Sequence, residues 1–565
     1  MKKNKKIKTG GVALADGIMF LSEKREVIVQ RKNNRLIGRT TSFIPSKVLI
    51  QKIPILRGIL NLKNQLAGAT GSFSASFGDG DTLSGKIVLI AYIVIIFCMI
   101  GIPVAVSVAF DEKYRNIVQL IGILIEILIY AIILITTTGM DKVYRYHGAE
   151  HKAVNTYEKC KNIDELTIDN IKKSSRIHKR CGGNLVMYVL FFILASILFP
   201  INNLALKWLA MSFFALLSVG LAYEIIGLFS LLPKPLDIIN YPACIIQLIT
   251  TKEPTDDMLE LARIGIIASV REKDKSVLEV VNEIKSKYPK IDIQDIYSAI
   301  ECALNKDRND IILNKETYTI SLSKELDIGY MIKRYIEEDY PLQYLTHKQY
   351  FYNEEYYVDE NVLIPRPDTE ILVEKAISYI NNEQENIENV VDLCTGSGAI
   401  GISIAKNVEK DIKMELIDIS HGALNVANRN IQKNNVQGKV HTLYSDLLNK
   451  KIEEIKEDEN KKVDMIVSNP PYIKSRDMAS LDKNVLKEPH LALDGGEDGM
   501  VFYNKIVEQA KLVLKNNGLL LFEIGYDELE QIRQLIYNNH EFKIIEEIKD
   551  YGGNDRVVVC RFQQI

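Results

Sequence analysis

Asn469, Pro470, Pro471 and Tyr472 form a run whose groups suit the binding of an amine or amide nitrogen. The run follows the apolar segment 463–467, which predicts a strand that ends at the edge of a pocket. The asparagine amide oxygen and the carbonyl of Pro470 would be paired acceptors, and Tyr472 would pack against a planar group. Asn469, Pro470 and Tyr472 are therefore candidate catalytic residues. A plain Pro-Pro turn explains the same residues equally well.

A glycine loop lies upstream, between an apolar run at 390–393 and a predicted helix at 399–406. Glycines let the backbone approach a ligand closely, and the helix N-terminus favours polar or anionic groups. The loop fits the dinucleotide pattern G-x-G-x-x-G poorly, and a tight turn is the alternative for the loop alone. The candidate cofactor-binding residues of this segment are Asp392, Cys394, Thr395, Gly396, Ser397 and Gly398.

Polar residues also follow the next two predicted strands. Asp418 ends the strand at 414–417 and could accept both hydroxyls of a ribose, while Asp446 and Leu447 follow 440–444 and would flank an adenine. Open α/β sheets bind ligands at this edge, to which Asn469 also contributes. A glycine loop and a ribose acid without a phosphate-binding lysine suit a nucleoside that lacks phosphates. S-adenosylmethionine is that nucleoside.

Alternating strands and helices from residue 390 onward predict a doubly wound parallel sheet. Further strands are expected at 519–524 and 556–561, and short amphipathic helices precede the sheet at 274–340. Two prolines make a rigid bend at 365–370. Within it Arg366 and Glu370 are candidate substrate contacts, together with Pro471, although helix capping explains such residues at least as well.

The N-terminal half contains four apolar stretches of membrane-spanning character, and buried soluble helices are the alternative. They lie near 87–110, 117–138, 185–201 and 209–232. The loop 139–183 holds ten Lys and Arg residues, which places it and the C-terminal half in the cytoplasm. Seven scattered cysteines without a C-x-x-C pair indicate a reducing compartment. We expect a multi-pass protein of the cell membrane with its soluble half in the cytoplasm.

The cytoplasmic loop carries His147 and His151 at helical i, i+4 spacing with Glu150 beside them, in the H-x-x-E-H order of inverted zinc hydrolases. His178 and Cys181 follow in the same loop, and Glu224 lies within the fourth apolar stretch. These six residues predict a divalent metal site, with zinc as the expected ion. Histidines that face solvent or lipid headgroups are the alternative.

The first ~270 residues resemble the YqhQ-like family of bacterial membrane proteins, which is predicted to be metal-dependent and has no established reaction. The resemblance rests on residues 10–19, 145–152, 175–182 and 250–254. It implies a membrane domain at 1–272, which could also be an anchor without catalysis.

Residues 274–565 resemble the release factor glutamine methyltransferase (PrmC/HemK) family. The resemblance rests on 341–344, 362–370, the Asp392 loop, 469–472, 488–489, 494–499 and 550–556. It implies a helical substrate-binding subdomain at 274–345 and a Rossmann-like class I S-adenosylmethionine-dependent methyltransferase domain at 346–565. Cys394 stands where many relatives have glycine, and Leu447 where many have an aromatic residue.

The resemblance further implies methylation of the side-chain amide nitrogen of the glutamine in the Gly-Gly-Gln tip of peptide-chain release factors. The alternatives are another protein acceptor and an exocyclic amine of a nucleic-acid base. The segment 453–459 is acidic, so we expect no nucleic-acid partner. Membrane lipid and release factors are the expected partners.

Overall fold

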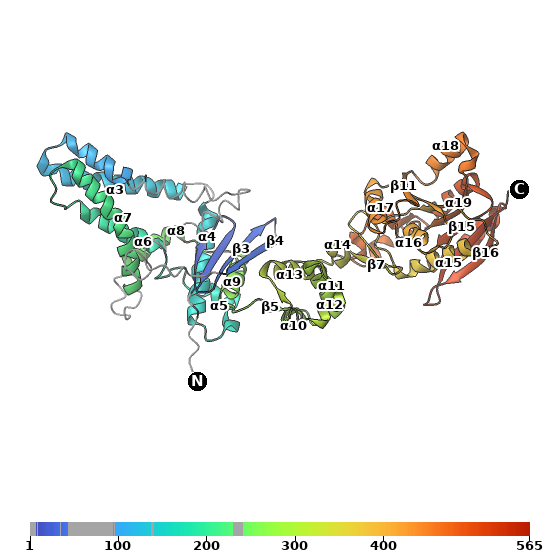
Figure 1. Ribbon diagram of the computed structural model, residues 1–565, viewed down its shortest axis with the longest axis horizontal. Coiled ribbons are helices and arrows are strands. Elements are labelled where there is room, and N and C mark those ends of the chain that lie inside the picture. Colours follow the sequence, from blue (N-terminus) through green and yellow to red (C-terminus); the bar gives the residue numbers. More distant parts are fainter. Residues whose placement is uncertain are drawn as a thin grey trace. The chain divides into compact units, whose positions relative to one another are not determined.

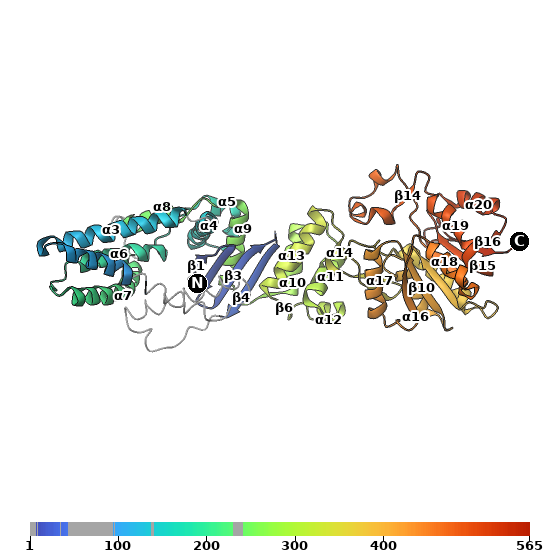
Figure 2. The same cartoon turned by 90° about the horizontal axis from the view of Figure 1, so that it is seen from above.

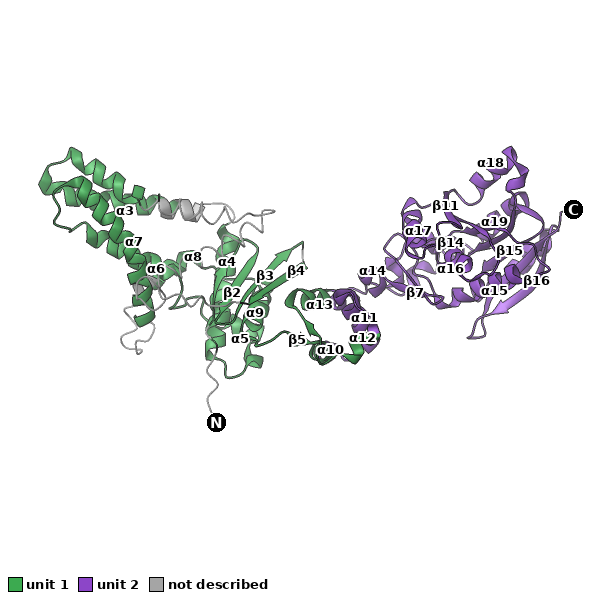
Figure 3. Cartoon of the chain, in the orientation of Figure 1, with its two compact units in different colours: residues 1–283, 309–330 green, residues 284–308, 331–565 purple. Residues whose placement is uncertain are grey.

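The computed structural model describes residues 7, 9–33, 35–42, 94, 97–136, 140–229 and 241–564 (Figure 1). The side chains of 130–131, 133–136 and 241–243 lie outside this description. The chain divides into two compact units, 1–283 with 309–330 and 284–308 with 331–565 (Figure 3). This division crosses the helical subdomain expected at 274–345, so the limits of that subdomain stay a prediction.

A four-stranded antiparallel meander, unexpected from the sequence, lies in the first unit. Its core face carries Phe20, Val27 and Val29, against which two helices pack. Gly265 lets the second helix lie close to the sheet, because a Cβ there would be 2.6 Å from the Phe20 ring. The elements are β1 (Thr9–Ala13), β2 (Gly17–Ser22), β3 (Arg25–Lys32), β4 (Arg35–Ser42), α4 (Met140–Lys159) and α9 (Asp256–Val270).

Apolar helices form a second cluster in the same unit, with Ile100, Ile123, Ile193 and Met211 at its centre. Only α7 is long and apolar enough to cross a membrane among the described residues. The other helices between residues 107 and 250 are η2 (Ser107–Ala109), α3 (Glu112–Thr136), η3 (Ile163–Glu165), α5 (Ile168–Lys172), α6 (Gly183–Ser196), α7 (Leu204–Phe229) and α8 (Tyr241–Thr250). Of these, α5 packs against α4 and α9 in the core of the meander.

The expectation of four membrane spans is therefore corrected to one within the described part of the chain. The stretch 185–201 falls on α6, whose 14 residues reach roughly 21 Å and cannot cross a core of about 30 Å. The described part of 87–110 is the shorter helix Phe97–Ala109. Residues 87–93, 95–96, 137–138 and 230–232 of the expected spans lie outside the described residues.

Amphipathic helices follow in the segment from residue 275 to residue 346, as the sequence pattern predicts. Asp292 caps α11 by accepting from the Gln294 backbone N–H at 2.9 Å. The elements are β5 (Lys275–Ser276), α10 (Val277–Lys287), α11 (Ile293–Leu304), α12 (Arg308–Leu313), β6 (Thr319–Ile320), α13 (Leu322–Glu337) and α14 (Leu342–Thr346).

A seven-stranded sheet organises the second unit in the order β11-β10-β9-β12-β15-β17-β16. The first five strands of this order are mutually parallel, and β17 is antiparallel to both of its neighbours. The six strands expected in this region are confirmed, and β16 is additional. The strands are β9 (Asn389–Leu393), β10 (Lys413–Asp418), β11 (Val440–Tyr444), β12 (Val463–Ser468), β15 (Leu514–Glu523), β16 (Phe542–Lys549) and β17 (Asp555–Phe562).

Helices cover both faces of this sheet (Figure 2). Successive residues of a strand pack against opposite helix layers. Val390 and Met465 pack beneath one layer, whereas Val391 and Ile466 pack beneath the other. The first layer is α15 (Glu370–Asn381), α16 (Ala399–Asn407) and α17 (His421–Lys433), and the second is α18 (Asn449–Glu457), α19 (Val501–Val513) and α20 (Leu529–Asn538).

The second unit also contains short strands and 3-10 helices. They are β7 (Gln349–Phe351), β8 (Glu354–Tyr356), η5 (Pro367–Thr369), η6 (Glu459–Lys461), β13 (Ile473–Lys474), η7 (Met478–Ser480), η8 (Val485–Lys487), η9 (His490–Ala492) and β14 (Asp494–Gly496). The segment from β13 to β14 follows the Asn-Pro-Pro-Tyr run directly, so it borders the carboxyl edge of the sheet.

Gly401 sets the distance between α16 and the sheet, because a Cβ there would be 2.3 Å from Leu416 Cδ2 and 3.1 Å from Asp392 Oδ2. We expect Gly401→Ala to lower the free energy of unfolding by about 1–3 kcal/mol through overpacking. Gly329→Ala is the control, since nothing lies within 4 Å of its Cβ position in α13. It should raise stability by about 0.5–1 kcal/mol. Calorimetric unfolding of the full chain measures both, and equal shifts would contradict the packing argument.

Candidate functional site

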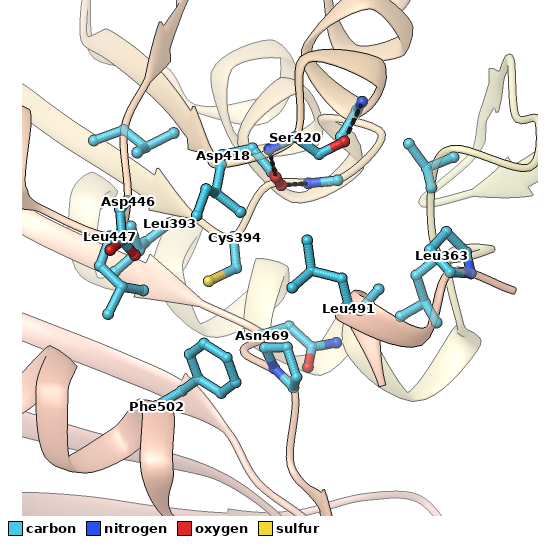
Figure 4. A pocket seen from close by; sticks show the side chains of 18 of the residues that line it. Leu363, Leu393, Cys394, Asp418, Ser420, Asp446, Leu447, Asn469, Leu491 and Phe502 are labelled. Atoms are coloured by element: carbon cyan, nitrogen blue, oxygen red, sulfur yellow. Dashed lines mark hydrogen bonds between the residues drawn. The ribbon is translucent and has the colours of Figure 1, made fainter. Parts of the chain in front are cut away.

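A pocket opens at the carboxyl edge of the seven-stranded sheet and measures about 830 Å³, including space continuous with solvent (Figure 4). Several predicted site residues meet there although they come from four different strand ends. The pocket is lined by Asn361, Val362, Leu363, Leu393, Cys394, Gly396, Ile417, Asp418, Ile419, Ser420, Ala423, Ser445, Asp446, Leu447, Asn469, Pro471, Pro489, Leu491, Ala492 and Phe502.

Asp392 holds the glycine loop together from beneath and does not line the pocket. Its carboxylate is fully buried and accepts hydrogen bonds from Thr395 Oγ1 at 2.6 Å and from the Gly401 backbone N–H at 2.9 Å. Burial raises the pKa of Asp392 to about 7, although both hydrogen bonds oppose that rise. The loop is therefore closed by one desolvated carboxylate that joins the strand end to the helix start.

The loop backbone runs through left-handed conformations at Cys394 (φ 61°), Gly396 (φ 55°) and Gly398 (φ 80°). Nothing lies within 4 Å of a Cβ position at Gly396, so its backbone faces open space. Thr395 and Ser397 are buried, and the Ser397 carbonyl accepts from Asn430 Nδ2 at 2.8 Å. Of the loop residues, Cys394 and Gly396 are the two that face the pocket.

Asp418 lies opposite the loop with its carboxylate already oriented. Its oxygens accept from the backbone N–H of Gly396 at 2.9 Å and of Ser420 at 2.8 Å (Figure 4). Burial raises the pKa of Asp418, while these bonds act against the rise. Asp446 and Leu447 line the far wall beside it, with Leu447 in a left-handed conformation at φ 48°.

The Asn-Pro-Pro-Tyr run begins where β12 ends, and Asn469 and Pro471 line the pocket. Asn469 Nδ2 donates to Thr369 Oγ1 at 3.3 Å. Pro470 is buried behind the wall, and Tyr472 packs against the second core layer. Burial raises the pKa of Tyr472 above its ordinary value, so its hydroxyl stays protonated.

Arg366 and Glu370 make contacts within the chain. Arg366 forms an ion pair with Glu488, whose other oxygen accepts from the Ile364 backbone N–H at 3.0 Å. Glu370 Oε1 accepts from the Tyr352 backbone N–H at 2.8 Å. Both charges are thus satisfied by the protein, and their role as substrate contacts stays a prediction.

Several pocket residues carry no sequence signal of their own. Phe502 comes from α19 and places an aromatic ring near Asn469 (Figure 4). Pro489 and Leu491 reach the pocket from the segment after β13, and Leu363 from the segment before η5. Only the family-specific segments 362–370 and 488–489 could have indicated part of this wall.

A second constellation lies in the first unit, where His147, His151 and Cys181 place one ligand atom each within 4.8 Å of one another. His147 Nδ1 hydrogen-bonds the Thr250 carbonyl at 2.9 Å, and His151 Nδ1 the Arg176 carbonyl at 2.6 Å. Both Nε2 atoms are thereby left for the cluster interior. Cys181 Sγ lies 3.4 Å from His147 Nε2.

Glu150 borders this cluster, with Oε2 3.6 Å from His151 Nε2 and 4.0 Å from His147 Nε2. Burial raises the pKa of Glu150 to about 8 and that of Cys181 to about 12, and it lowers the pKa of both histidines. His178 instead points Nε2 towards Glu158 at 3.4 Å.

The predicted ligand set is therefore brought together only in part. His147, His151 and Cys181 form the cluster among the described residues, and Glu150 lies beside them. His178 and Glu224 do not belong to that group. A tetrahedral zinc ion with bonds of about 2.0–2.3 Å separates its ligand atoms by roughly 3.3–3.7 Å, which fits the spacing of Cys181 and His147.

The strand order and the pocket at the strand ends define a class I S-adenosylmethionine-dependent methyltransferase. Residues 369–546 match the family model described as "Methyltransferase small domain". Residues 53–272 match the model described as "Protein of unknown function (DUF1385)", the YqhQ-like family.

The release factor glutamine methyltransferase of Clostridium acetobutylicum is 40% identical over 289 residues, 50% of this chain and 96% of the relative. The enzyme of the same name from Clostridium botulinum is 38% identical over 46% of this chain and 88% of the relative's length. The ribosomal protein uL3 glutamine methyltransferase of Francisella tularensis is 35% identical over 41% of this chain and 69% of its own. Through its C-terminal half, the chain belongs to the release factor glutamine methyltransferase family.

The left-handed conformation at Cys394 predicts a stability difference between two variants. A β-branched side chain is strongly disfavoured at φ 61°, so Cys394→Val should lower the free energy of unfolding by about 1–2 kcal/mol. Cys394→Gly adopts the same backbone freely and is the control. Calorimetric midpoints of the full-length variants test this, and a valine variant as stable as the glycine variant would contradict it.

Proposed function

We propose that the C-terminal half transfers the methyl group of S-adenosylmethionine to the side-chain amide nitrogen of a glutamine in a peptide-chain release factor. The carrying observation is the placement of Asn469 in the pocket wall, at the same edge of the sheet as the glycine loop and Asp418. The three relatives are all named as glutamine methyltransferases, and the two Clostridium enzymes are named for release factors.

The cofactor pocket would use the residues that the sheet edge brings together. Gly396 leaves room for the amino acid portion, and Asp418 would accept the ribose hydroxyls. Asp446 and Leu447 would border the adenine, and Phe502 would supply an aromatic contact that Leu447 lacks. When bound, the sulfonium carries the methyl group as an electrophile.

The acceptor needs precise orientation, because the amide lone pair is delocalised into its carbonyl and is a poor nucleophile. Asn469 Oδ1 and the Pro470 carbonyl would accept the two amide hydrogens and hold the nitrogen in line with the methyl group. Tyr472 would pack beside the amide plane. Catalysis would come from orientation and electrostatics without a covalent intermediate.

Asn469→Ala should lower the rate of methyl transfer by about 10²–10³-fold, because one of the two acceptors is lost. The affinity for S-adenosylmethionine should change little. The measurement uses full-length protein, labelled S-adenosylmethionine and a release factor, with mass spectrometry to locate the label. Asn428→Ala on the exposed side of α17 is the matched control. An unchanged rate for Asn469→Ala, or a label away from a glutamine, would refute the proposal.

For the N-terminal half, we propose a membrane-associated domain that places the methyltransferase at the cytoplasmic side of the cell membrane. α7 supplies one helix of sufficient length. Large apolar side chains on α3 and α7 are also exposed by about half, as expected for surfaces that meet lipid. They include Ile117, Ile121, Ile125, Leu128, Leu209, Phe213 and Leu228.

We also propose that His147, His151 and Cys181 bind a zinc ion, with Glu150 as a neighbouring ligand or base. Two imidazoles whose Nδ1 atoms bond backbone carbonyls are preset to offer Nε2 to a metal. Deprotonated Cys181 would supply the soft donor that zinc favours.

Zinc content separates this site from ordinary buried histidines. Purified full-length His147→Ala, His151→Ala and Cys181→Ser proteins should lose most of the bound zinc measured by plasma mass spectrometry. His178→Ala should retain it, because His178 faces Glu158 rather than the cluster. Zinc retained in all four variants, or absent from the unaltered protein after growth with zinc, would overturn the assignment.

A further inference from the structure

A buried carboxylate stands directly behind Asn469. Glu523 is the last residue of β15, whose neighbour in the sheet is β12, with Ser468 paired to Phe522 in register. Glu523 is 2% exposed, and Thr369 at the end of η5 is 4% exposed. Three polar side chains therefore meet here: Asn469 after β12, Glu523 at the end of β15 and Thr369 at the end of η5.

These three side chains face one another. Asn469 Nδ2 donates to Thr369 Oγ1 at 3.3 Å, and Thr369 and Asn469 are the hydrogen-bonding side chains that lower the pKa of the Glu523 carboxylate, whose Oε2 accepts no hydrogen bond from the described residues. Arg556 lies nearby, but its guanidinium donates to Asp550 at 3.1 Å and to the Ile524 carbonyl at 3.3 Å. The hydrogen-bond donors that face the carboxylate are therefore neutral.

The direction of these bonds follows from what each group can do. An ionised carboxylate only accepts, so the single hydroxyl hydrogen of Thr369 is directed to Glu523. Thr369 Oγ1 must then accept from Asn469, which turns both amide hydrogens of Asn469 inward. The amide oxygen is left for the pocket. Without this constraint, the two ends of an asparagine amide are interchangeable in shape.

We propose that Glu523 is a positioning residue that fixes the amide orientation of Asn469 through Thr369, so that Asn469 presents an acceptor to the substrate nitrogen. The inference rests on the proposed methyl transfer to an amide. A reversed amide would offer N–H groups to a substrate that itself presents N–H groups, and the acceptor pair with Pro470 would be lost.

Protonation of Glu523 would weaken the orientation of the Asn469 amide. A carboxylic acid can donate a hydrogen bond to Thr369, which reverses the direction of the hydrogen bonds between Glu523, Thr369 and Asn469. Burial raises the pKa of Glu523 to about 7, and the hydrogen bonds from Thr369 and Asn469 and the charge of Arg556 oppose the rise. Asp368, Tyr472 and Tyr503 also face this carboxyl group. The ionised form predominates above pH 7, so turnover should rise with pH through that value.

The experiment compares full-length Glu523→Gln and Thr369→Val with two controls. Both variants should lower kcat for methyl transfer by roughly 10²-fold, because the acceptor loses its orientation. The Kd for S-adenosylmethionine should stay within about twofold. Thr369→Ser keeps the hydroxyl and should restore most of kcat. Glu528→Gln removes a similarly buried carboxylate that instead binds the Gly525 N–H, and kcat should persist.

The pH profile gives a second readout. The rise of kcat near pH 7 should be present in the unaltered protein and absent in Glu523→Gln. Unchanged kcat and an unchanged pH profile in Glu523→Gln would overturn the inference while leaving the proposed function intact. Failure of the unaltered protein to methylate a release factor would instead overturn the proposed acceptor.

A measurement that needs no acceptor keeps these failures distinct. In protein labelled with ¹⁵N-asparagine, the side-chain signals of Asn469 are assigned through their absence in Asn469→Ala. Glu523→Gln and Thr369→Val should shift both amide hydrogens of Asn469, whereas Glu528→Gln should leave them in place. Signals unaffected by all three substitutions would overturn the relay whatever the substrate.

Discussion

The carboxylate of Asp392 is the interaction on which the methyltransferase site depends. It ties the Thr395 hydroxyl to the first turn of α16 and so fixes the loop that carries Gly396. That loop supplies the backbone N–H which orients Asp418. Ser468 adds a matching tie by donating to the Leu393 carbonyl at 2.7 Å, which aligns the end of β12 with the end of β9. The glycine loop and the end of β12 are thus positioned by buried polar contacts of Asp392 and Ser468, which do not line the pocket.

In the N-terminal half, backbone carbonyl groups orient the side chains of the histidine cluster. Thr250 and Arg176 each accept a hydrogen bond from the Nδ1 side of a histidine, so both rings are oriented by the fold. α8 contributes further, because Gln247 bonds the backbone of His178 in both directions and thereby holds the segment that leads to Cys181. In both halves of the chain the fold orients the side chains of the candidate site. The C-terminal half uses buried polar side chains, and the N-terminal half uses backbone carbonyl groups.

The sheet and the polar residues at its carboxyl edge could be predicted because apolar runs alternate with helices and because glycines and acids follow the strands. β16 was missed because its apolar residues are interrupted by Lys and Glu without a regular period. The β1–β4 meander was missed because β1 is short and rich in glycine and because β3 carries four charged residues. Thr369, Phe502 and Glu523 act through contacts between distant segments, which local patterns do not encode. The prediction of membrane spans failed where the apolar stretch continues beyond the end of the helix, as it does at α6.

The position of β17 between β15 and β16 has a consequence for biosynthesis. Residues 555–562 must leave the ribosome before the sheet can close and β15 gains its second neighbour. Synthesis at roughly 5–20 residues per second means that the N-terminal half emerges tens of seconds earlier. The first half can therefore fold while the sheet of the second half is still open. During that interval the edge of β15 that will pair with β17 is unpaired, and an unpaired strand edge favours aggregation.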